Sequence, residues 1–165
     1  MRKGDVIEQP SEGERFEILR SAHNDGGPLQ FEWTLQPGKP GPPEHYHPHE
    51  HEIIKVLSGR ARITLDGEVI ILEAGKSLRM PAGVPHQIRV DGDEPLRCRC
   101  TSDQGLYFER ILDLLSEGGF KGFSKAAQFI NKNPDALVQT QRHIRAVVWS
   151  VGKLGWLLGH RHRDA

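Results

Sequence analysis

The sequence predicts a mainly β domain of the sandwich or barrel type, followed by a helical segment towards the C-terminal end. Short runs rich in β-branched and aromatic residues alternate with Gly- and Pro-containing turns at intervals of about ten residues in the first part of the chain. After Gln104 the apolar residues recur with helical spacing instead. We therefore expect a β domain over residues 1–103 and a C-terminal helical extension over residues 104–165.

Seven segments have the length and composition of β-strands. They are Phe16–Ser21, Leu29–Leu35, Ile53–Leu57, Ala61–Leu65, Val69–Leu72, His86–Val90 and Pro95–Thr101. The strongest local signal is Asp66-Gly67, which separates the fourth segment from the fifth. A two-residue hairpin turn requires positive φ, which Asp and Gly adopt more readily than most residues. The two flanking segments are therefore expected to pair as a hairpin.

Three helices are expected in the extension. They are Leu106–Glu117, Ser124–Asn131 and Asp135–Leu158. Gly118-Gly119 ends the first, which places four apolar residues near one side: Leu106, Ile111, Leu114 and Leu115. Ser124 is a candidate N-cap for the second helix, and Pro134 suits the first turn of the third.

The last of these helices carries an amphipathic stripe. The stripe consists of Ile144, Val147, Val148, Val151, Leu154 and Leu158. Its apolar part is shorter than the roughly 20 residues that span a bilayer, and it contains Arg145 and Lys153. We expect the stripe, with Trp149 and Trp156, to pack on the β domain or on a second copy in a homodimer. Contact with a membrane surface through the basic flanks is the less favoured alternative.

Composition limits the partners and the compartment. The 22 basic and 22 acidic residues cancel, so no overall field favours nucleic acid. The first residues lack the apolar stretch of a secretory signal. The two cysteines, Cys98 and Cys100, would lie on one face of a strand about 7 Å apart, too far for an unstrained disulfide. We expect both to pack in the core of a reduced, cytoplasmic protein.

The most informative feature is a cluster of histidines. His45, His47, His49 and His51 alternate in a stretch that ends at Glu52, and a further histidine, His86, follows a rigid Pro- and Gly-rich turn. Imidazole and carboxylate groups are preferred ligands of divalent transition metals, so the pattern predicts a metal site.

The position of Pro48 predicts which side chains of this stretch point towards the metal site. It cannot donate to a β-ladder and indicates a bend after His47, so that Glu52 begins the next strand. His45 and His47 can then meet Glu52 across the bend. His49 and His51 are expected to point away from the ligands, towards solvent or the surroundings of the site.

Two stretches resemble the motifs of the cupin superfamily. In the first, His45, His47, Glu52 and Gly59 stand at the motif spacing, whereas Gly41 lies two residues closer to His45 than the motif asks. In the second, the matching residues are Gly75, Pro81, Gly83 and His86, and Val90 replaces the usual Asn. The motifs cover about residues 41–90 and are highly specific. The chain is thus similar to single-domain bacterial-type cupins, with a C-terminal helical extension outside the motifs.

The resemblance implies a double-stranded β-helix, the cupin jelly-roll barrel, with a pocket between its sheets. It implies one divalent metal (Fe, Mn, Ni, Co or Zn) held by His45, His47, Glu52 and His86. Such a ligand set leaves one or two positions open for water or substrate. It also implies that Glu52 can leave the metal and act as a catalytic base.

Two functions follow from this resemblance. The first is a small metalloenzyme that acts on a small organic molecule by dioxygenase-like or isomerase-like chemistry. The second is a non-catalytic cupin that binds or senses a small molecule. No DNA-reading unit is visible in the sequence, which weakens a regulatory role. The candidate pocket residues are mostly apolar: Phe31, Trp33, Tyr46, Ile54, Met80 and Ile88.

Overall fold

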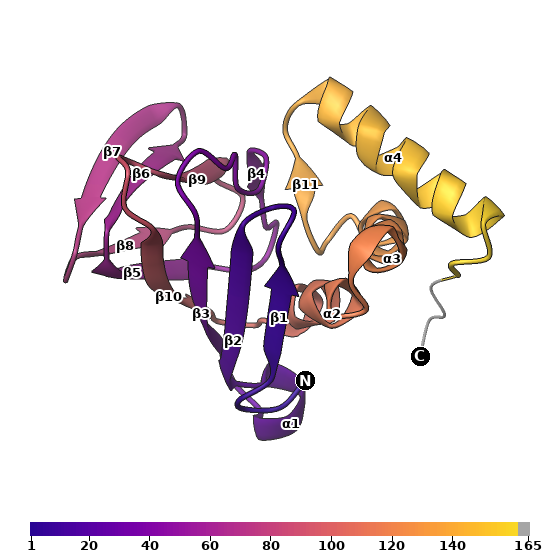
Figure 1. Cartoon of the computed structure of the whole chain (residues 1–165), viewed down its shortest axis with the longest axis horizontal. Helices are drawn as coiled ribbons and strands as arrows, with labels where there is room; N and C mark the ends of the chain where they lie inside the picture. The colour runs from indigo at the N-terminus through magenta and orange to yellow at the C-terminus, as the bar shows by residue number, and fades with distance from the viewer. Residues whose placement is uncertain (162–165) are drawn as a thin grey trace.

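The computed structural model describes residues 1–161, which form two antiparallel sheets flanked by helices (Figure 1). The first sheet has the strand order β1 (Val6–Gln9), β2 (Glu14–Arg20), β3 (Leu29–Leu35), β10 (Leu96–Ser102), β5 (Glu52–Ser58) and β8 (Ser77–Met80). The second has the order β11 (Val138–Gln139), β4 (His45–Tyr46), β9 (His86–Val90), β6 (Arg60–Leu65) and β7 (Glu68–Glu73). The prediction of a mainly β fold with C-terminal helices is confirmed.

The core lies between the two sheets. Side chains alternate along each strand, so every second residue of β3 faces inwards, from Leu29 to Leu35. On β10 the inward residues include Cys98 and Cys100, which are buried free thiols with their Sγ atoms 3.9 Å apart. Arg97 and Arg99 point outwards from the same strand and both bind the carboxylate of Glu32. The prediction that the cysteines pack in the core is confirmed.

The hairpin between β6 and β7 also follows the prediction. Asp66 and Gly67 both have positive φ, 50° and 81°, as a two-residue turn of this type requires. The strands pair from Leu65↔Glu68 outwards without a shift in register. Strands β1 and β8, at the far ends of the first sheet, were not expected from the sequence.

The first of the three predicted helices begins at the expected residue, and the other two do not. Helix α2 (Leu106–Leu115) is as expected, except that Leu106 is exposed. Helix α3 (Gly119–Lys132) starts before Ser124, which is buried inside it and donates to the carbonyl of Lys121 instead of capping the helix. A Cβ atom at Gly122 would lie 2.7 Å from the carbonyl oxygen of Leu114. A glycine of low helix propensity is therefore kept in α3 because it allows close approach to α2.

The third helix is shorter than predicted. Helix α4 (Arg142–Leu157) is preceded by non-helical residues that include β11, which pairs with β4. Ala136 and Leu137 are buried in this segment. Tertiary pairing and burial thus override the helical pattern of the segment that follows Pro134.

Helix α4 lies against α3 on the side away from the sheets (Figure 1). Gly152 and Gly155 are buried at this contact, where a Cβ atom on Gly155 would overlap Ser124. The apolar stripe is only partly buried within the described chain: Ile144 and Val148 line a cavity shared with the β domain, whereas Val147, Leu154 and Leu158 are each at least half exposed. Trp149 and Trp156 are exposed in the same way. None of the helices within residues 1–161 has the length and apolar character needed to cross a bilayer.

The C-terminal segment is in contact with the β domain at several points. Strand β11 adds to the second sheet, and the Gln9 side chain donates to the carbonyl of Leu115. Glu109 of α2 accepts hydrogen bonds from Ser21, Ala22 and His23 and so caps α1 (Ala22–Asp25). The division at residues 103 and 104 stays a prediction.

Candidate metal centre

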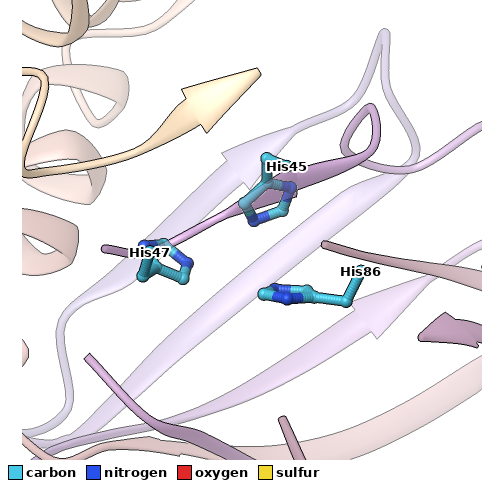
Figure 2. Close-up of side chains that lie close together, drawn as sticks. All are labelled: His45, His47 and His86. Carbon is cyan, nitrogen blue, oxygen red and sulfur yellow. The ribbon is translucent and has the colours of Figure 1, made fainter. Parts of the chain in front are cut away.

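Three histidines converge between the sheets (Figure 2). His45 lies on β4 directly opposite His86, the first residue of β9, and His47 follows just after β4. One ligand nitrogen from each of the three imidazoles lies within 4.8 Å of the others. All three side chains are buried. The pairing of β4 with β9 therefore brings together the two sequence motifs.

Backbone carbonyls fix the orientation of each ring. The Nδ1 atom of His45 lies 2.7 Å from the carbonyl oxygen of Pro43. The Nδ1 atom of His47 lies 2.9 Å from the carbonyl oxygen of Ala136, and that of His86 lies 3.0 Å from the carbonyl oxygen of Val84. Because a carbonyl only accepts, each Nδ1 carries the proton, and the Nε2 lone pair remains for another partner. This is how metal-binding histidines are usually held.

Two of these nitrogens lack a hydrogen bond in the described part of the chain. Nε2 of His47 and Nε2 of His86 are buried, and neither has a hydrogen-bond partner within residues 1–161. A buried acceptor without a partner costs free energy, and its presence in a native fold calls for an explanation. A cation at the point where the nitrogens converge would supply that partner.

Glu52 supplies a carboxylate at the same place. Its Oε2 atom lies 3.9 Å from Nε2 of His47 and 3.6 Å from Nε2 of His86. Burial acts to raise the pKa of Glu52, but the nearby imidazoles of His86, His47 and His45 outweigh it and lower the pKa below its ordinary value. The carboxylate is therefore ionised.

The surroundings shift the pKa values of His45 and His86 in opposite directions. Burial, together with His47 and His86, lowers the pKa of His45 to about 3, so this ring is neutral. Burial also acts to lower the pKa of His86, but the Glu52 carboxylate outweighs it and raises the pKa. The four residues form a buried set of three nitrogens and one carboxylate, which fits one divalent transition metal.

The remaining histidines of the cluster lie outside the set. His49 is exposed, with Nε2 3.2 Å from Asp135, and His51 accepts a hydrogen bond from the Ala82 amide through Nδ1. Sequence reasoning missed Glu50, which is buried next to the site, accepts a hydrogen bond from Ser102 and has its pKa raised by burial. Nothing in the His- and Glu-rich stretch distinguishes Glu50 from exposed neighbours. The carbonyl of Ala136 could not be found either, since backbone atoms leave no mark in a sequence.

A cavity of about 570 Å³ opens beside this set. His45, Glu52 and His86 are among its lining residues. Most of the wall is apolar and comes from both the β domain and the helices: Phe16, Phe31, Ile88, Phe108, Leu112, Leu115 and Ile130. Of the predicted pocket residues, Phe31, Trp33 and Ile88 line the cavity. Ile54 and Met80 are instead packed in the core, and Tyr46 is not among the lining residues.

Comparison with known proteins agrees with the motifs and the geometry. Residues 31–102 match the profile of the Cupin domain family. The fold resembles that of a protein described as a predicted oxalate decarboxylase from Thermotoga maritima, with 21% identity and a TM-score of 0.52 over 62% of this chain and 96% of the other. These matches show that residues 31–102 form a domain of the cupin type, and that the barrel has the double-stranded β-helix fold.

Curated relatives match over shorter stretches. A protein named polyketide synthase CurC from Streptomyces cyaneus is 43% identical over 54 residues, or 33% of this chain and 35% of the relative. Quercetin 2,3-dioxygenase from Bacillus subtilis is 44% identical over 62 residues, or 36% of this chain and 18% of the relative. The chain therefore aligns with well under half the length of these relatives.

Proposed function

We propose that the chain binds one divalent transition metal (Fe, Mn, Ni, Co or Zn) through His45, His47, Glu52 and His86. One observation carries the proposal. Nε2 of His47 and Nε2 of His86 are buried without partners within residues 1–161 and converge on an ionised carboxylate. Each ring is already held by a carbonyl on its other nitrogen, so little rearrangement is needed for binding.

On this centre we propose a small metalloenzyme that acts on a small organic molecule by dioxygenase-like or isomerase-like chemistry. Four protein ligands leave one or two positions open towards the cavity, as in catalytic rather than structural sites. A bound metal would polarise an oxygen-bearing substrate or activate dioxygen. The similarity to quercetin 2,3-dioxygenase over 62 residues supports an enzyme of this class.

Glu52 is the proposed catalytic base. It lines the cavity, so its carboxylate can accept a proton from a substrate bound there. The apolar wall around it limits access of water and strengthens its interaction with the substrate.

The metal assignment is tested by elemental analysis of purified protein. We expect about one metal per chain in the parent protein and its loss in His47→Ala and in His86→Ala, with circular dichroism unchanged. The matched control is His49→Ala, which changes an exposed histidine of the same stretch. Unchanged metal in both site variants would overturn the assignment.

Catalysis is tested separately from metal binding. Metal-loaded protein is incubated aerobically with a panel of uncharged aromatic compounds, and products are followed by mass spectrometry with the Glu52→Gln variant as the control. Turnover by the parent protein that is lost in Glu52→Gln at a metal content matched to that of the parent supports the enzyme. Tight binding without turnover would favour a non-catalytic binding or sensing cupin.

We further propose a cytoplasmic homodimer whose interface is formed by α4. The outer half of this helix exposes large apolar side chains, interspersed with Arg142, Ser150 and Lys153: Val147, Trp149, Leu154, Trp156, Leu157 and Leu158. Apolar patches of this kind are usually covered in the functional assembly, and a second copy offers a matching apolar face. The unbonded thiols of Cys98 and Cys100 suit a reducing compartment.

A further inference from the structure

The end of the cavity away from the histidines contains a second pair of polar groups without partners. Trp33 is only 3% exposed, and its indole Nε1 has no hydrogen-bond partner within residues 1–161. Oε1 of Glu14 is also buried without a partner in the same part of the chain. Both residues line the cavity. Two unpaired groups in one wall are costly unless a ligand satisfies them.

The strand register places this pair at a distance from the metal centre. Glu52 lies opposite Ser102 of β10, whereas Trp33 lies opposite Cys98. The four residues between these levels correspond to about 13 Å of strand. Glu14 faces the same side of β2 as Phe16, whose ring stacks on that of Trp33 at 6.1 Å. A ligand that reaches from Glu14 and Trp33 to the metal centre must therefore be about as long as two or three directly linked aromatic rings.

The wall between the two ends is aromatic and apolar. Phe16, Phe31 and Phe108 line it, and Phe31 and Phe108 meet edge to face with centroids 5.2 Å apart. Rings of this kind pack well against a planar aromatic ligand. A sugar or another strongly hydrated molecule would lose its hydration here without gaining hydrogen bonds.

The two polar groups also select the charge of the ligand. Glu12 lines the cavity next to Glu14, so an anionic group at this end would be repelled. Burial, with Glu12, raises the pKa of Glu14 to about 7, and the Trp33 indole opposes this rise without reaching hydrogen-bonding geometry. A hydroxyl group satisfies both residues, because it can donate to Oε1 of Glu14 and accept from the indole N–H.

We propose that Glu14 and Trp33 bind a hydroxyl group of an uncharged aromatic ligand whose other end reaches the metal centre. The inference rests on the proposed function in that it takes the cavity to be the ligand site. It deepens that function by assigning the ligand class as hydroxylated aromatic compounds. The apolar wall and the carboxyl groups of Glu12 and Glu14 disfavour phosphorylated sugars and small dicarboxylates.

The test compares three probes by isothermal titration calorimetry: 4-hydroxybiphenyl, 4-methoxybiphenyl and biphenyl-4-carboxylate. In the parent protein we expect the hydroxyl probe to bind at least about tenfold more tightly than the methoxy probe, since one donated hydrogen bond to a buried acceptor is lost. The carboxylate should bind more weakly than either. In Glu14→Leu and in Trp33→Phe the preference for the hydroxyl probe should fall to about threefold or less.

Two controls locate the hydroxyl group. Glu17→Leu changes a neighbouring glutamate on the outer face of β2 and should keep the preference. His47→Ala, whose metal content is measured in parallel, should also keep it, because the hydroxyl does not bind at the centre. A preference that is lost in His47→Ala but retained in Glu14→Leu and Trp33→Phe would overturn the inference and leave the metal centre intact. Absence of binding by every probe would overturn the inference as well, whereas the metal content would still decide the metal assignment.

Discussion

The clearest quantitative prediction concerns the stability of Glu14→Gln as a function of pH. The pKa of Glu14 is raised from its ordinary 4.5 to about 7 by burial and by Glu12. The folded state therefore holds the proton more tightly than the unfolded state. The contribution of this group to stability is complete below pH 4.5 and is lost as the pH rises through about 7.

The magnitude follows from the interval between the two pKa values. At about 1.4 kcal/mol per pKa unit the full effect is about 3 kcal/mol, of which about 2 kcal/mol falls between pH 5 and pH 8. Gln has nearly the same shape and does not titrate. The variant should therefore gain about 2 kcal/mol relative to the parent protein when the pH is raised from 5 to 8.

Urea unfolding of both proteins at the two pH values measures this difference. Other titrating groups, including those of the metal centre, are common to both proteins and cancel when the variant is compared with the parent. Glu17→Gln on the outer face of β2, in a surface ion pair with Arg15, is the control and should show a difference well below 1 kcal/mol. If the difference in free energy of unfolding between the parent protein and Glu14→Gln is the same at both pH values, the reasoning is refuted.

Three further predictions follow from the same structure. The double change of His49 and His51 to Gln should leave about one metal per chain by elemental analysis, because both side chains lie outside the converging set. Gly41→Ala should lower the free energy of unfolding by roughly 1 to 3 kcal/mol in urea titrations, since φ is 63° there and a Cβ atom would lie 2.8 Å from the Ile88 carbonyl oxygen. A chain that ends at Gln141 keeps β11 but lacks α4, so light scattering should show a monomer with metal retained; a dimer of unchanged affinity would refute the proposed interface.

Much of the fold could be predicted from local patterns. Alternation and turn residues identify the central strands, and the positive φ values of Asp66 and Gly67 confirm the hairpin that this dipeptide signals. The metal residues could be predicted because motif spacing reflects a fixed strand pairing, here His45 opposite His86. These features depend on few residues that are close in sequence or linked by a known register.

The features that were missed depend on contacts between distant segments. The early part of helix α3 contains Gly122, where a side chain would overlap the backbone of Leu114, and the residues after Pro134 leave the helical pattern because β11 pairs with β4. The inward direction of Glu14 could be inferred from alternation only if β2 had been known to begin there. Propensity acts over a few residues, whereas these outcomes are decided by packing partners far along the chain.

The hydrogen bond between His47 and the Ala136 carbonyl has a consequence for how the chain responds to its metal. The Ala136 carbonyl orients the His47 ring only while the segment before α4 lies against the β domain. Metal binding and the packing of this segment are therefore thermodynamically linked. The coupling must be equal in both directions. Amide hydrogen exchange at Val138 and Gln139 of β11 should therefore slow when metal is added. Metal binding can thus be followed at backbone amides outside the site, without a spectroscopic signal from the ion itself.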